Sequence, residues 1–152
     1  MGLTVPFMGG CYGALRLAKA VRAVLPRAKI ALGGGFVGNH LRNLKEPAVF
    51  EFLDYIVLDA DERPLECLIE HLQGRQPRSG LHRTWVRENG QVAYKVQDDL
   101  ADIPQALTGH PTYTELPLDR YFSAMQVPNA VGWLQMGLRW HKLSLAHGCY
   151  WR

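Results

Sequence analysis

The first 75 residues alternate between short, mainly apolar runs and amphipathic segments, and this alternation limits the folds open to the chain. The apolar runs are Leu3–Phe7, Lys29–Leu32 and Tyr55–Leu58. Each is too short for a helix and is separated from the next by residues with three- and four-residue apolar spacing. Short apolar strands that alternate with helices are typical of a parallel sheet covered by helices. The pattern predicts an α/β fold with a Rossmann-like or flavodoxin-like parallel sheet.

The connecting segments carry recognisable helix boundaries. A helix is predicted from about Ala14 to Leu25, where Pro26 ends it, and a short helix around Pro47–Phe52. Another is predicted after the acidic loop at residues 59–62, ending before Gly74. Its inner face is expected to carry Leu65, Leu68, Ile69 and Leu72.

The second half of the chain has a different character. An Asn-Gly turn at Asn89–Gly90 lies between two β-rich runs and predicts a hairpin. An irregular connector rich in proline and aromatic residues follows over Asp98–Pro128, and Leu143–Ala146 reads as a last strand. We therefore divide the chain into an α/β domain at residues 1–75, a hairpin and connector at 76–141, and the start of another domain at 142–152.

Composition excludes several classes of protein. A net charge of +3 from scattered residues does not indicate nucleic-acid binding. No apolar run approaches the roughly 20 residues that cross a bilayer, and the apolar start lacks the basic segment of a signal peptide. We expect a cytoplasmic protein with reduced cysteines. Cys11 and Cys67 fall in predicted helices and are interpreted as structural thiols.

Two loops at predicted strand ends could contact a ligand. Gly33, Gly34 and Gly35 follow the second strand directly, where they either admit a ligand or serve tight turn geometry, and both interpretations stay open. Neither a dinucleotide fingerprint nor a Walker lysine is present, which disfavours nucleotide hydrolysis. The acids Asp59, Asp61 and Glu62 are interpreted as complementing a helix dipole rather than as a metal site.

Cys149 has a distinctive context. A predicted strand delivers His147, Gly148 and Cys149 at its end, and aromatic residues follow. His147 and Cys149 share a strand face, but no third group orients them, so a thiol hydrolase is disfavoured. The segment resembles the opening of the cluster-binding loop of radical-SAM enzymes, in which closely spaced cysteines hold a [4Fe–4S] cluster.

The resemblance extends along the chain to the cobalamin-binding radical-SAM family. It rests on the order of Gly2–Val5, Leu32–Gly35, Asp54–Val57, Glu62–Leu65, Glu88–Gly90, Leu100–Pro104 and Ala146–Cys149. It implies a partial cobalamin-binding domain, a hairpin, a connector and the first strand of a radical-SAM barrel. It also implies that Thr4 and Gly33, Gly34 and Gly35 lie near the nucleotide tail of cobalamin, and that Cys149 is a cluster ligand. No catalytic residue is assigned.

The chain departs from the family in ways that limit its expected activity. The family's first strand and helix would precede Met1, and no Asp-x-His-x-x-Gly motif offers cobalt a histidine. The [4Fe–4S] cluster and S-adenosylmethionine are therefore expected only in an intact parent enzyme, whose substrate is not legible here. We expect the unpaired sheet edge to promote self-association. Alternatives are a non-catalytic α/β module for a phosphate-bearing ligand or a partner protein, and a flavodoxin-type electron carrier.

Overall fold

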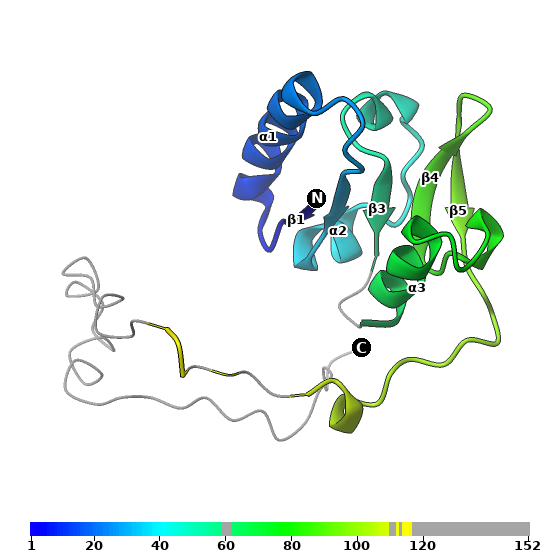
Figure 1. Cartoon of the computed structure of the whole chain (residues 1–152). Helices are drawn as coiled ribbons and strands as arrows, with labels where there is room; N and C mark the ends of the chain where they lie inside the picture. Colours follow the sequence, from blue (N-terminus) through cyan, green and yellow to red (C-terminus); the bar gives the residue numbers. More distant parts are fainter. Residues whose placement is uncertain (59–61, 110–111, 113, 117–152) are drawn as a thin grey trace. The chain divides into compact units, whose positions relative to one another are not determined.

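Five short strands form one sheet in the computed structural model, which describes residues 1–58, 62–109, 112 and 114–116. The chain divides into a unit at Met1–Ile103 and a unit at Pro104–Arg152. The strands all belong to the first unit, in the order β1-β2-β3-β4-β5 (Figure 1). They are β1 (Gly2–Thr4), β2 (Ala31–Gly33), β3 (Tyr55–Val57), β4 (Thr84–Glu88) and β5 (Gln91–Lys95).

Three α-helices connect these strands. They are α1 (Cys11–Val24), α2 (Gly35–His40) and α3 (Glu62–Leu72). Short 3₁₀ helices occupy Met8–Gly10, Pro47–Glu51, Arg78–Gly80 and Gln105–Leu107. Helix α2 was not predicted, because its six residues include two glycines and an asparagine, which have low helix propensity. Among the described residues, no helix is both long and apolar enough to span a bilayer.

The α/β class is confirmed, but the sheet is mixed rather than wholly parallel. Strands β1, β2 and β3 are parallel, whereas β4 is antiparallel to both β3 and β5. The predicted hairpin forms, with Asn89 at φ 49° and Gly90 at φ 80°, as the turn requires. It pairs with β3 and lies in the first unit, whereas the sequence indicated a hairpin grouped with the connector. The connector beyond residue 116, the strand predicted at 143–146 and Cys149 lie outside the described residues.

Alternate strand residues divide the interior into two cores. Leu32 and Ile56 face α1, α2 and the Pro47–Glu51 turn, and Ala18 of α1 is fully buried against them. Tyr55 and Val57 face the opposite side of the sheet, where Leu68 of α3 packs. Helices α1 and α2 thus cover one face and α3 covers part of the other, as period-2 alternation requires.

Helix α3 buries less of its apolar surface than the sequence indicated. Leu68 is buried, but Leu65, Ile69 and Leu72 are each at least 43% exposed. The expectation that all of them form the inner face is therefore wrong. These residues, spaced by four and three positions, form a separate stripe beside the buried face. We call Leu65, Ile69 and Leu72 the α3 stripe.

Candidate functional site

The glycine loop lies at the carboxyl edge of the parallel strands. Gly34 has φ 105°, a conformation nearly restricted to glycine. A Cβ placed there would lie 2.8 Å from the backbone nitrogen and oxygen of Val5, and the Phe36 N–H donates to the Val5 carbonyl at 3.1 Å. Close packing of this loop on the chain after β1 therefore accounts for Gly34 without any ligand.

Gly33 and Thr4 occupy a different environment. They are register partners on β2 and β1, so they share a face of the sheet, and Gly2 pairs with Ala31 on that same face. Gly2 and Thr4 are exposed, while Ala31 and Gly33 are half-buried. A Cβ at Gly33 would meet only the Val57 carbonyl oxygen at an ordinary 3.6 Å. These small residues, Gly2, Thr4, Ala31 and Gly33, form what we call the small-residue floor.

Helix α3 covers part of the same sheet face, since Leu68 packs against Tyr55 and Val57. On one flank of α3, Cys67 Sγ lies 4.0 Å from Nε2 of Gln97, a residue that follows β5. By helical periodicity the α3 stripe lies on the opposite flank of the helix, where it is exposed. This face of the sheet therefore combines a floor without large side chains and exposed aliphatic side chains on the helix that covers it.

Exposed apolar side chains also surround the start of α1, close after the end of β1. Phe7, Met8 and Tyr12 are 78%, 68% and 72% exposed. The Arg16 guanidinium lies 6.0 Å from the centre of the Tyr12 ring, within reach of a cation–π interaction. Because the carboxyl ends of parallel strands are where open α/β sheets bind ligands, this apolar rim is at the expected edge.

The described residues hold no group of at least three histidine, cysteine or acidic side chains that could bind a metal. The acidic loop at 59–61, His147 and Cys149 lie outside them. Burial raises the pKa of the Cys67 thiol, with the Gln76 hydrogen bond and Arg63 opposing the shift. Cys67 is thus a poor nucleophile, as expected of a structural thiol. Cys11 is partly buried at the first residue of α1.

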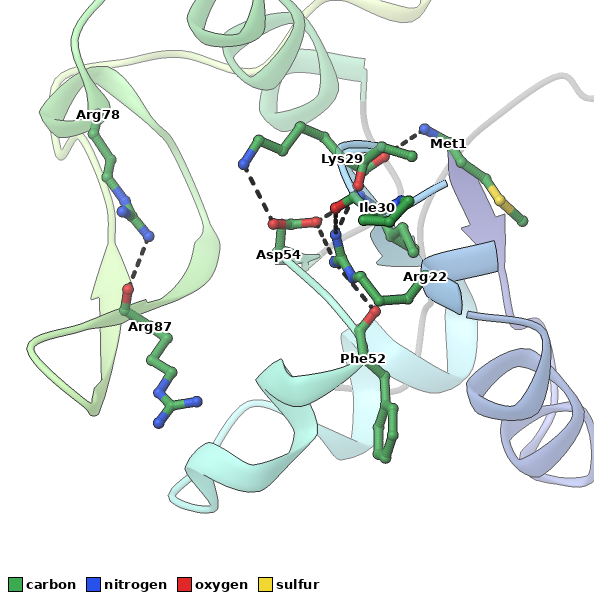
Figure 2. Close-up of polar contacts among 10 residues, drawn as sticks. Met1, Arg22, Lys29, Ile30, Phe52, Asp54, Arg78 and Arg87 are labelled. Carbon is green, nitrogen blue, oxygen red and sulfur yellow. Dashed lines mark hydrogen bonds and ion pairs between the residues drawn. The ribbon is translucent and has the colours of Figure 1, made fainter. Parts of the chain in front are cut away.

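At the amino ends of the parallel strands, a polar network is centred on Asp54 (Figure 2). Arg22 Nη2 donates to Asp54 Oδ2 at 2.7 Å, and the Ile30 N–H donates to the same oxygen at 2.9 Å. Lys29 Nζ lies 3.5 Å from Oδ1. Partial burial raises the pKa of Asp54, but the Arg22 and Ile30 hydrogen bonds and the two cations outweigh it, so the pKa is lowered. The network joins α1 to β2 and β3.

The contacts at the amino ends of the parallel strands also fix the turn after α1. Arg22 Nη1 also donates to the Ala28 carbonyl at 2.8 Å, which fixes the turn after α1. A hollow of about 540 Å³ lies near this turn, lined by residues 24–28. Its lining is mainly apolar, and nearby Arg22 is engaged with Asp54.

Of the residues predicted to contact cobalamin, Thr4 and Gly33 lie side by side on neighbouring strands. Gly34 instead packs against the Val5 backbone. Cys149 lies outside the described residues. The floor and the α3 stripe were not identified from sequence. Parallel alignment of Gly2–Thr4 with Ala31–Gly33 could have revealed the floor, since small residues alternate in both runs. No family model, curated protein or solved structure matches the chain.

Proposed function

We propose that this chain is the cobalamin-binding part of a cobalamin-dependent radical-SAM enzyme, and that the small-residue floor receives the nucleotide tail of the cofactor. The single observation that carries the proposal is the pairing of Thr4 with Gly33 on an open sheet face. An elongated ligand can lie against a sheet only where no large side chain stands above the backbone. The floor meets that requirement.

The neighbouring groups fit the same ligand. The Leu65 and Ile69 side chains provide an aliphatic wall for an aromatic base, and the Thr4 hydroxyl can donate to or accept from a polar group of the tail. Phe7 and Met8 offer apolar contact to a macrocycle at the carboxyl edge. When bound, cobalamin would carry a methyl group or shape the radical site, and the protein would position it.

Cobalamin binding by this chain is expected to be weak, with Kd of about 10 µM or higher, because the site is open on the β1 side. We expect no histidine ligation to cobalt, since the sequence lacks Asp-x-His-x-x-Gly. Titration with hydroxocobalamin gives the affinity from visible spectra. EPR of the reduced cob(II)alamin form identifies its axial ligand. Tight binding with nitrogen coupling from a protein imidazole would contradict this expectation.

A matched pair of variants locates the binding site. Gly33→Val places a branched side chain on the floor beside Thr4, and its Cβ has only an ordinary contact with the protein. Ala23→Val adds a branched side chain at an exposed position of α1, which covers the other face of the sheet. We expect Gly33→Val to weaken hydroxocobalamin binding at least about fivefold and Ala23→Val to leave it within about twofold. Equal affinities for the two variants would exclude the floor.

The isolated chain is not expected to assemble a [4Fe–4S] cluster. Such clusters use several cysteine thiolates, and Cys149 is the only cysteine in the motif-like segment. After anaerobic reconstitution, we expect iron and sulfide far below about four per chain. Cys149→Ser should leave the residual iron unchanged. About four irons bound to a monomer would disprove the expectation.

A second candidate function is a non-catalytic interaction module. It is favoured by the extent of exposed apolar surface on α1 and β1, which carries no charged side chain before Arg16. A phosphate-binding role has less support, because Gly34 is explained by packing on Val5. A folded wild-type chain that binds no hydroxocobalamin would favour the interaction module.

A further inference from the structure

The β1 edge of the sheet presents unpaired backbone groups. Val5 N–H donates to the Gly33 carbonyl and Ala31 N–H donates to the Met1 carbonyl, so the odd-numbered residues of this segment pair with β2. By alternation, Gly2 and Thr4 direct their N–H and C=O groups away from β2. No described strand lies beyond β1. The edge is therefore open to another strand.

The other end of the sheet shows how an edge is protected. Strand β5 ends in Lys95, whose ammonium pairs with Glu88 at 2.7 Å, and charged side chains on an edge discourage further pairing. Strand β1 contains Gly2, Leu3 and Thr4, with no charge and no proline. Only Pro6, two residues past the strand, would end a ladder there. Of the two edge strands, β1 is the one built to accept a partner.

Helix α1 extends this surface away from the sheet. Arg22, on one flank of α1, reaches Asp54 just before β3, toward the middle of the sheet. Because β1 is the edge strand, the opposite flank of α1 is directed outward past β1. Figure 1 places α1 and β1 together at the end of the sheet away from β4 and β5. The residues on this outer flank are all exposed and uncharged: Gly13, Leu17, Ala20 and Val24. We call them the α1 stripe.

We propose that a second copy of this chain binds here, with β1 pairing antiparallel to its symmetry mate and the two α1 stripes in contact. Gly2 and Thr4 both point their backbone groups outward, so a two-fold axis at Leu3 places Gly2 of one copy opposite Thr4 of the other as a hydrogen-bonded pair. Each outward N–H then meets a carbonyl. The edge is complementary to itself in this register.

Charge supports a copy of the chain as the occupant. The α1 stripe brings no charged side chain against its mate, and its alternation of small and larger residues suits close helix packing. Arg16, three residues after Gly13 and four before Ala20, lies at the margin of the stripe beside the Tyr12 ring, and Lys19 lies farther around the helix. A charged partner would find no complementary group on the α1 stripe.

The size of the surface predicts a weak dimer. Helix α1 has 14 residues, which gives a length of about 21 Å. With the sheet about 10 Å below the helix axis and the helix extending about 5 Å above it, the face covers on the order of 300 Å² per copy. The two copies together would bury on the order of 600 Å², below the roughly 1,200 Å² of standard interfaces, so we expect Kd on the order of 10–100 µM or weaker.

Sedimentation equilibrium of the full chain over a range of concentrations tests the proposal. Leu17→Lys puts a charge at the centre of the α1 stripe and is expected to weaken dimerisation at least about tenfold. Val96→Lys puts the same charge at an exposed apolar position after β5, at the other end of the sheet, and should leave the dimer unchanged. Both sites are exposed, so both variants should have the same melting temperature as the wild-type chain. A monomeric wild-type chain at about 500 µM, or equal effects of the two variants, would overturn the proposal.

Cross-linking tests the register separately. In the two-fold pairing, Leu3 faces Leu3 of the other copy with Cα atoms about 4.5 Å apart, within disulfide range. Leu3→Cys should therefore form a 3–3 disulfide on mild oxidation, detected by peptide mapping. Two Thr4→Cys residues would be offset by two residues, about 7 Å along the strands, which puts their Cα atoms about 8 Å apart, too far for a disulfide. A 4–4 cross-link without a 3–3 cross-link would overturn the proposed pairing.

Discussion

Replacing Gly34 by alanine is expected to lower the free energy of unfolding by at least about 3 kcal/mol. The added Cβ would lie 2.8 Å from the nitrogen and carbonyl oxygen of Val5, which are backbone atoms and cannot rotate away. The residue also has φ 105° and ψ 173°, a conformation that side chains disfavour. Relief of the clash would separate the loop from the chain after β1, with loss of the Phe36 N–H bond to Val5. Urea unfolding followed by far-UV circular dichroism measures the effect.

Gly35 supplies the matched control for this substitution. It is the next residue, it begins α2, and a Cβ there would lie 3.5 Å from the Pro6 carbonyl oxygen, an ordinary contact. Gly35→Ala should change the free energy of unfolding by no more than about 0.5 kcal/mol. If Gly34→Ala were as mild as Gly35→Ala, the close approach to Val5 could not explain the glycine. Ligand contact would then become the stronger explanation for Gly34.

The strands and the hairpin could be predicted because each is specified by local sequence. Tyr55–Val57 is buried on both faces and reads as a continuous apolar run, and Asn89–Gly90 supplies the left-handed turn. The pairing of the hairpin with β3 is not local. It depends on Thr84 and Trp85 meeting Val57 and Ile56, which no periodicity within the hairpin reveals.

The position of the candidate site was only partly predictable, for a related reason. Thr4 and Gly33 were selected as single residues, but the floor exists because register brings β1 and β2 into alignment. The stripe on α3 was misassigned because Leu65, Leu68 and Ile69 form one broad apolar arc in the sequence. The face that is buried consists of Pro64, Cys67 and Leu68, so Leu68 is the one residue of that arc that is buried. The local sequence pattern predicts the helix, but which of its apolar residues are buried depends on the neighbouring strands.

Removing the carboxylate of Asp54 is expected to cost about 2 to 3 kcal/mol at pH 7, the usual range for hydrogen bonds to a charged group. Asp54→Ala leaves the Arg22 guanidinium and the Ile30 N–H without the acceptor that joins them across α1 and β2 (Figure 2). Asp98→Ala, at an exposed position, should change stability by no more than about 0.5 kcal/mol. In a double-mutant cycle, Arg22→Met should add little to Asp54→Ala, since both remove the same interaction. Additive losses would show that the pair is not coupled.

The pH dependence of this loss follows from the direction of the pKa shift. The pKa of Asp54 is lowered in the folded state, so its stabilisation is fully present above the ordinary value of 3.8 and is lost as pH falls through the folded pKa. Unfolding free energies of the wild-type chain and Asp54→Ala should therefore differ by a constant amount between about pH 5 and pH 7. Below about pH 4, the difference should shrink as protonation removes the ion pair from the wild-type chain alone. A difference that grew on acidification would require a raised pKa, and would mean that burial, rather than Arg22, controls this carboxylate.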